Sequence, residues 1–157
     1  LKGEGERFID VDTTPLVVDD MLIAASSAGG LYAMDRQSGR IRWRVPVEGG
    51  GGIAYDGEQL YFAAAEHGFY ALDLSGNVIW RQGARKGGEP AQPLIHQGHV
   101  YFATARAGLF VADKRSGEVV QYFDPGSGIS SQPTLGQQRL FVLSNGAVLY
   151  SLGIEDL

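Results

Sequence analysis

The sequence predicts an all-β protein built from the blades of a β-propeller, with about four four-stranded antiparallel blades in this chain. Three observations predict this fold class. An internal repeat of about 40 residues occurs four times, and each repeat consists of short apolar runs of strand length separated by turn residues. Glycine supplies 23 of the 157 residues, about twice the usual share of roughly 7%. Since these glycines have no collagen-like period, they indicate a chain that turns often.

The four units share one spacing. The residues at positions 15, 53, 93 and 133 each lie seven positions before the second apolar run of their unit. A glycine opens the third run at positions 30, 68, 108 and 146, so the intervals between these glycines are 38, 40 and 38 residues. Four strands in a period of about 40 residues are typical of a propeller blade.

The order of strands within a unit follows from its turns. The first two runs are separated by pairs that favour hairpin turns, namely Asp19-Asp20, Asp56-Gly57, Gln97-Gly98 and Gln137-Gln138. The third strand begins at the repeat glycine, and fourth strands are predicted over residues 40–45, 77–81 and 118–123. We therefore predict one partial propeller domain over residues 1–157, with a lead-in segment at 1–12 and blades at about 13–48, 51–86, 91–125 and 131–152.

The fourth unit is incomplete, because residues 151–157 are too few and too polar for a good fourth strand. An open set of blades leaves unpaired sheet edges, which natural proteins avoid. Three arrangements stay open: a ring of four blades, self-association of two chains into an eight-bladed ring, or half of a longer eight-bladed protein. We expect the last of these, and the start at Leu1 rather than Met also predicts further chain upstream.

Composition argues against several function classes. A net charge of −5 does not suit a general nucleic-acid surface, so no nucleic-acid partner is expected. The absence of cysteine removes thiolate nucleophiles, zinc–thiolate sites and disulfides. The apolar runs are shorter than the ~20 residues that a membrane-spanning helix needs.

The turn between the third and fourth strands carries the most specific pattern. In the first unit it reads Ala-x-Asp-x-x-Ser-Gly-x-x-x-Trp, beginning at Ala33. It recurs one residue shorter in the second unit, and in part in the third. Aspartate at such a turn favours hydrogen bonds to its own backbone. The predicted structural positions of the repeat are Asp35, Gly39, Trp43, Asp73, Gly76, Trp80, Asp113 and Gly117.

This pattern resembles the repeat of the pyrroloquinoline-quinone-type eight-bladed propellers. In that superfamily the tryptophan packs between neighbouring blades, where its ring buries a large area and its N–H can reach a carbonyl. The segment at residues 7–18, RFIDVDTTPLVV, resembles the mid-chain segment of BamB-type outer-membrane assembly lipoproteins. The remainder of the chain is similar to the C-terminal half of those proteins.

The resemblance implies a non-enzymatic periplasmic scaffold of the outer-membrane β-barrel assembly machinery. Such a scaffold binds the POTRA domains of the insertase and is anchored to the outer membrane by an N-terminal lipid that this chain lacks. The family's contact surface includes the loop after the third strand of the first blade. The positions of this sequence that match that loop are Met34, Asp35, Arg36 and Gln37. The predicted partner-binding set contains these four residues and also Glu66 and His67. The family tends to have an aliphatic residue in place of Arg36 and an arginine in place of Gln37.

Two other functions stay open, a fragment of a quinone-dependent dehydrogenase and an extracytoplasmic sensor or ligand-binding propeller. The dehydrogenases hold the quinone over a tryptophan, often beside two cysteines. Here both tryptophans are in repeat positions and cysteine is absent, so no cofactor is expected. His96 and His99 flank a hairpin turn without a third ligand, so we expect no metal site. No Ser, His and carboxylate lie in register, so we expect no catalytic residues.

Two further segments have simple interpretations. The glycines at 49–52 lack the lysine and helix of a phosphate-binding loop, and we expect a flexible connector between blades. Arg81, Arg85 and Lys86 form a basic cluster, which we expect in a solvated loop.

Overall fold

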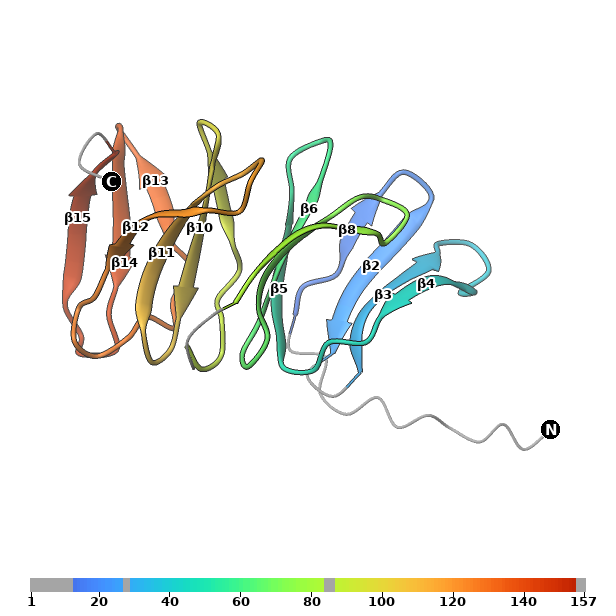
Figure 1. Ribbon diagram of the computed structural model, residues 1–157, viewed down its shortest axis with the longest axis horizontal. Coiled ribbons are helices and arrows are strands. Elements are labelled where there is room, and N and C mark those ends of the chain that lie inside the picture. The colour runs from blue at the N-terminus through green and yellow to red at the C-terminus, as the bar shows by residue number, and fades with distance from the viewer. Residues whose placement is uncertain (1–12, 27–28, 84–86, 155–157) are drawn as a thin grey trace.

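The computed structural model describes residues 13–26, 29–83 and 87–154, and these form fifteen strands in four separate antiparallel sheets (Figure 1). Sheet 1 contains β1 (Leu16–Val18), β2 (Met21–Ser26), β3 (Gly30–Asp35) and β4 (Ile41–Val45). Sheet 2 contains β5 (Gly50–Tyr55), β6 (Leu60–Ala64), β7 (Gly68–Leu72) and β8 (Val78–Gln82). Sheet 3 contains β9 (Leu94–His96), β10 (His99–Thr104), β11 (Gly108–Asp113) and β12 (Val119–Phe123). Sheet 4 contains β13 (Thr134–Gly136), β14 (Arg139–Leu143) and β15 (Leu149–Gly153).

Each sheet is an up-and-down meander, and the four sheets follow one another side by side along the molecule (Figure 1). This arrangement confirms the predicted class of propeller blades. Sheet 4 has three strands among the described residues, as the short fourth unit predicts. None of the described residues belongs to a helix that is long and apolar enough to cross a membrane.

The alternation of side chains along the strands explains the stacking. In β2 the buried residues Met21, Ile23 and Ala25 alternate with partly exposed ones, because one face of sheet 1 is covered by sheet 2. In β6 and β7 every residue is buried, because sheet 2 is covered on both faces. The sequences of β6 and β7 are therefore apolar throughout, because sheet 2 has a neighbour on each face.

Three apolar clusters fill the junctions between sheets. Ile23, Leu31 and Ala33 of sheet 1 share a cluster with Leu60, Phe62 and Leu72 of sheet 2. Aromatic rings dominate the next junction, where Phe69 of sheet 2 stacks on Phe102 of sheet 3 with ring centroids 4.2 Å apart. The last cluster joins Tyr101 and Leu109 of sheet 3 to Leu140 and Val142 of sheet 4.

The prediction of a flexible connector at 49–52 is wrong for Gly50–Gly52, which belong to β5. These glycines allow neighbouring inner strands to approach closely. A Cβ atom on Gly51 would lie 2.5 Å from Pro90, and one on Gly52 would lie 2.3 Å from the Cα atom of Gln92. The physical reason for this glycine run is backbone packing rather than flexibility.

Candidate partner-binding rim

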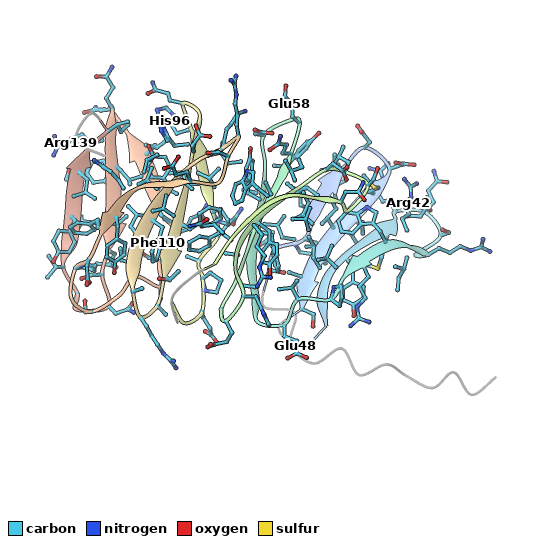
Figure 2. All side chains as sticks on the ribbon, viewed as in Figure 1. Arg42, Glu48, Glu58, His96, Phe110 and Arg139 are labelled. Carbon is cyan, nitrogen blue, oxygen red and sulfur yellow. The ribbon has the colours of Figure 1, made fainter. Side chains whose placement is uncertain are left out.

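The meander places its turns at two opposite ends of the sheets. We call one end the upper rim; it contains the hairpin turns at 19–20, 56–57, 97–98 and 137–138 and the turns at 36–40, 73–77 and 114–118. The opposite end, with the turns before Gly30, Gly68 and Gly108, is the lower rim. A backbone hydrogen bond joins the two upper-rim turns of sheet 1: the N–H of Arg36 donates to the carbonyl of Asp20 at 2.8 Å. Figure 2 shows Glu58 on the upper rim and Glu48 on the lower.

The predicted contact loop at residues 34–37 lies on the upper rim of sheet 1, and Asp35 organises it. The Asp35 carboxylate accepts hydrogen bonds from the backbone N–H groups of Gln37 at 3.1 Å and Ser38 at 2.8 Å, and from the Ser38 hydroxyl at 2.8 Å. Asp73 and Asp113 cap the corresponding turns in the same way. These bonds, with the backbone N–H of Ser38 first, hold the pKa of Asp35 well below its usual range. The carboxylate of Asp35 thus stabilises the turn through its hydrogen bonds.

Arg42 adds a second restraint on this loop. Its guanidinium donates to the carboxylate of Asp35 at 2.6 Å and to the carboxylate of Asp20, so it bridges the two turns of sheet 1. The bond from Arg42 lowers the pKa of Asp20. The fork shape of the guanidinium suits such a bridge. The loop is therefore held in one shape before any partner arrives.

Three of the predicted contact residues differ in what they offer a partner. The side chains of Arg36 and Gln37 are exposed, whereas Met34 is half-buried on the face of β3 that points away from sheet 2. A positively charged group and an amide therefore project from a rigid turn. This combination can recognise a carboxylate or backbone carbonyls of another protein.

Glu66 and His67 lie on the lower rim, in the turn between β6 and β7. Both are exposed, and the His67 carbonyl accepts hydrogen bonds from the guanidinium of Arg81. The structure does not bring this pair together with residues 34–37, because the two sets occupy opposite ends of the sheets. The meander topology makes this separation unavoidable.

The two repeat tryptophans fasten the upper-rim turns at 73–77 and 114–118 to the preceding sheet. The Nε1–H of Trp43 donates to the carbonyl of Leu74 at 2.8 Å, and that of Trp80 donates to the carbonyl of Lys114 at 2.9 Å. The rings lie directly on the turn glycines of the next sheet. A Cβ atom on Gly76 would be 2.7 Å from the Trp43 ring, whereas one on Gly39 would meet nothing within 4 Å.

An ion pair that the sequence analysis missed links sheets 2 and 3 on the same rim. The Asp56 carboxylate accepts from Lys114 Nζ at 2.8 Å and from the backbone N–H groups of Glu58 and Gln59, and the Tyr61 hydroxyl lies 3.2 Å away. Burial tends to raise the pKa of Asp56, but the bonds from Lys114 and the backbone outweigh it and lower that pKa to about 2. Burial, followed by the Asp56 charge, raises the pKa of Tyr61. The only sequence signal was the turn pair Asp56-Gly57 opposite a lysine in the next unit.

The remaining candidates from the sequence do not form a site. His96 and His99 face each other across the β9–β10 hairpin, and no group of three or more metal-ligating side chains occurs within the described ranges. Of the basic cluster, Arg81 lies on β8, while Arg85 and Lys86 lie outside the described residues.

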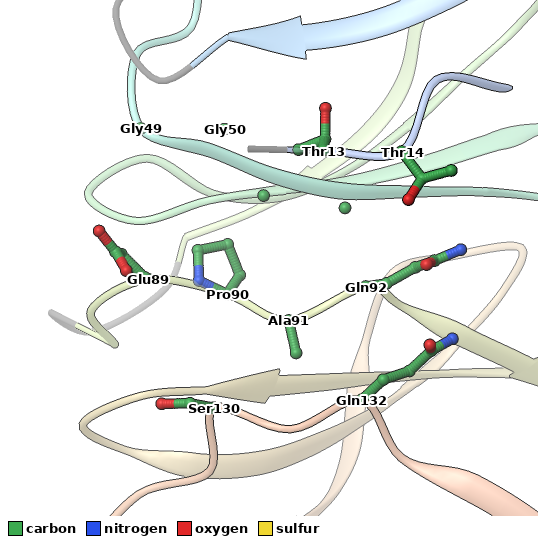
Figure 3. A pocket seen from close by; sticks show the side chains of 12 residues that line it. Thr13, Thr14, Gly49, Gly50, Glu89, Pro90, Ala91, Gln92, Ser130 and Gln132 are labelled. Carbon is green, nitrogen blue, oxygen red and sulfur yellow. The ribbon is translucent and has the colours of Figure 1, made fainter. Parts of the chain in front are cut away.

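A cavity of about 370 Å³ lies among the inner strands (Figure 3). Its described lining consists of Thr13, Thr14, Gly49–Gly52, Glu89, Pro90, Ala91, Gln92, Ser130 and Gln132. Glu89 is the one ionisable side chain in this set, and the set contains no aromatic ring. The quinone cofactor carries carboxylates, so it needs cationic groups and a flat platform that these residues do not supply. The described lining therefore does not fit the quinone.

The four sheets share one repeat and stack side by side, and each repeat tryptophan packs on a turn glycine of the next sheet. These features define a β-propeller of the PQQ-like repeat class. The chain belongs to the family described as outer membrane protein assembly factor BamB, whose sequence model matches residues 2–82 and 69–157.

Individual comparisons agree with this assignment. The outer membrane protein assembly factor BamB of Escherichia coli K12 is 26% identical over 151 residues, which are 95% of this chain and 38% of that protein. The crystal structure of BamB from Moraxella catarrhalis superposes with a TM-score of 0.75 at 20% identity, covering 90% of this chain and 43% of that one. A quinohemoprotein alcohol dehydrogenase from Comamonas testosteroni shares the fold with a TM-score of 0.66, 18% identity and coverage of 85% and 29%. The chain thus spans about two fifths of the length of the BamB proteins that it matches.

Proposed function

We propose that this chain is part of a non-enzymatic scaffold for outer-membrane protein assembly, located in the periplasm and associated with the outer membrane. The observation that carries the proposal is the BamB family match over nearly the whole chain. A scaffold needs a rigid surface and no reactive centre. The upper rim of sheet 1 suits this role, because Asp35 and Arg42 fix the turn from which Arg36 and Gln37 project.

The proposed partner is the POTRA region of the β-barrel insertase, and the proposed contact is residues 34–37. Arg36 is the main contact, since a preformed turn presents its guanidinium without an ordering cost for the backbone. Asp35 positions the loop and is not a free acceptor. Glu66 and His67 are left out of this contact, because they lie on the lower rim. An N-terminal lipid on the full-length protein would hold the scaffold at the membrane.

Calorimetric titration of the chain with purified POTRA domains from the same source tests the proposal. We expect saturable one-to-one binding, and we expect Arg36→Ala to weaken it by about tenfold, because truncated interface arginines often cost more than 1 kcal/mol. Glu66→Ala is the matched control on the lower rim and should bind like the unmodified chain. Equal affinities for Arg36→Ala and Glu66→Ala would reject the rim assignment, and no binding by any of the three would reject the POTRA contact in this part of the protein.

A further inference from the structure

The outer strand of each four-stranded sheet presents an edge that no other described strand covers. These strands are β4, β8 and β12, and each lies at the end of its sheet and pairs with a described strand on one side only (Figure 1). The backbone N–H and C=O groups on the free side of such a strand can pair with a strand of another protein. Natural proteins protect exposed edges, often with charged side chains. The three strands differ in this protection.

Charge decreases from the first of these strands to the third. The sequence of β4 is IRWRV, with Arg42 and Arg44, and that of β8 is VIWRQ, with Arg81. The sequence of β12 is VVQYF and contains no charged residue. Two of its side chains are well exposed, Val120 at 47% and Tyr122 at 49%. The strand β12 therefore combines a free edge with uncharged residues of high β-propensity.

Arg44, Arg81 and Tyr122 occupy the same place in their sheets. Each pairs with an aromatic residue of the neighbouring strand and packs on its ring; these residues are Tyr32, Tyr70 and Phe110, respectively. Each also donates a hydrogen bond to a backbone carbonyl of a lower-rim turn; the acceptors are Gly29, His67 and Ala107. Tyr122 thus keeps both contacts of the arginines and lacks only their charge. Because its structural role is the same, the replacement points to a difference in what the edge binds.

We propose that the β12 edge captures an extended strand of an unfolded outer-membrane β-barrel precursor. This inference rests on the proposed function in outer-membrane protein assembly and names the substrate class. A strand destined for a membrane barrel has one apolar face, and its backbone groups need partners on both edges. It therefore matches an edge that offers backbone pairing and apolar contacts without charge. The edge belongs to sheet 3, apart from the proposed POTRA contact on sheet 1.

The geometry of β12 favours weak and reversible capture. Its pairing register against β11 shifts between Val111 and Ala112, which marks a β-bulge, and a bulge limits pairing along an edge. The ladder is regular where Phe110 pairs with Tyr122 and Leu109 with Phe123. An added strand would therefore pair over few residues, next to Tyr122. Reversible binding suits a scaffold, because a precursor that is held permanently could not reach the membrane.

Fluorescence anisotropy with a labelled peptide tests the proposal. The probe is a peptide of about ten alternating valine and threonine residues, the length of a membrane strand, with a lysine at each end for solubility. We expect saturable binding to the 157-residue chain with a Kd of the order of 100 µM. The same peptide with two central prolines cannot form the hydrogen-bonded ladder and should not bind. Equal binding of the two peptides would overturn capture through the backbone.

Two reciprocal variants locate the capture edge. Tyr122→Arg gives β12 the charge that β4 and β8 carry, and an arginine can make the same two contacts, so the fold should be kept, which far-UV circular dichroism checks. This variant should bind the peptide at least about tenfold more weakly. Arg81→Tyr removes the charge of β8 and should add a second capture edge, so that the chain binds two peptides. Unchanged affinity in Tyr122→Arg would overturn the assignment to β12.

The POTRA titration of the same proteins separates this inference from the proposed function. Tyr122→Arg should bind POTRA domains like the unmodified chain, because residues 34–37 are untouched. Peptide binding without POTRA binding would support the capture edge and reject the POTRA contact. POTRA binding without peptide binding would reject the capture edge alone.

Discussion

The interior sheets and the end sheets of the stack share one repeat, but equivalent residues differ in how deeply they are buried. Phe69 in sheet 2 is buried against the rings of Phe102 and Phe110, whereas Leu149, at the equivalent position of sheet 4, is mostly exposed. Gly76 lies under Trp43, whereas Gly39, at the equivalent position of sheet 1, meets open space. The difference teaches that burial in this fold comes from the neighbouring sheet rather than from the sheet itself. A side chain's importance therefore depends on its place in the stack as much as on its identity.

The largest expected effect comes from removing an interior ring. Phe102 is fully buried, stacks on Phe69 and meets Trp80 edge-on, so Phe102→Ala should destabilise the fold by about 3–5 kcal/mol. Leu149→Ala should change the stability of the single chain by less than about 0.5 kcal/mol. Urea unfolding of both variants and of the unmodified chain measures the two losses. Similar losses for the two variants would contradict the comparison.

A matched pair of glycines isolates the tryptophan contact. Gly39 and Gly76 both have positive φ, so an alanine at either position costs about 1–2 kcal/mol of backbone strain. Gly76→Ala also drives a methyl group into the Trp43 ring and should cost about 1–2 kcal/mol more than Gly39→Ala. Thermal unfolding of the two variants checks the difference. If Gly39→Ala were the more harmful change, the inferred role of the ring would be wrong.

The Asp56 ion pair predicts a pH-dependent difference. Its carboxyl has a folded pKa of about 2 against an ordinary 3.8. A group whose pKa is lowered on folding contributes stability above its unfolded pKa and loses it as the pH falls through the folded pKa. Asp56→Asn should therefore cost about 2 kcal/mol at pH 7, and this cost should shrink between pH 4 and pH 2. Denaturant unfolding of both proteins across this range is the measurement; a cost that stays constant with pH would exclude the ion pair as its cause.

The sequence predicted the fold well because the repeat is expressed in local signals. Turn pairs such as Gln97-Gly98, and glycines such as Gly68 at strand starts, require particular backbone angles and can be found without knowledge of neighbours. The prediction of a flexible connector at 49–52 was wrong because the structure of this segment depends on a contact distant in the sequence. Its glycines are needed because Pro90 and Gln92, in the segment before β9, approach β5 closely, a contact that no local pattern reveals.

The candidate site was predictable only in part. The pattern around Asp35 indicated a turn, but not that Arg42 would bridge Asp35 to Asp20 and hold the loop. The grouping of residues 34–37 with Glu66 and His67 ignored the meander, which sends successive turns to opposite rims. The contact of Lys114 with Asp56 joins residues 58 positions apart and depends on the packing of sheets 2 and 3.

Amide hydrogen exchange of this chain tests the central claim most directly, because it reports the stability of each strand separately. We predict that β6, β7 and β10, in sheets covered on both faces, exchange only through global unfolding. The outer strand β15, with sheet 4 covered on one face, should exchange at least about tenfold faster through local opening. Equal protection of β15 and β7 would contradict the account, since it would mean that a sheet in this fold is stable without a neighbour on each face.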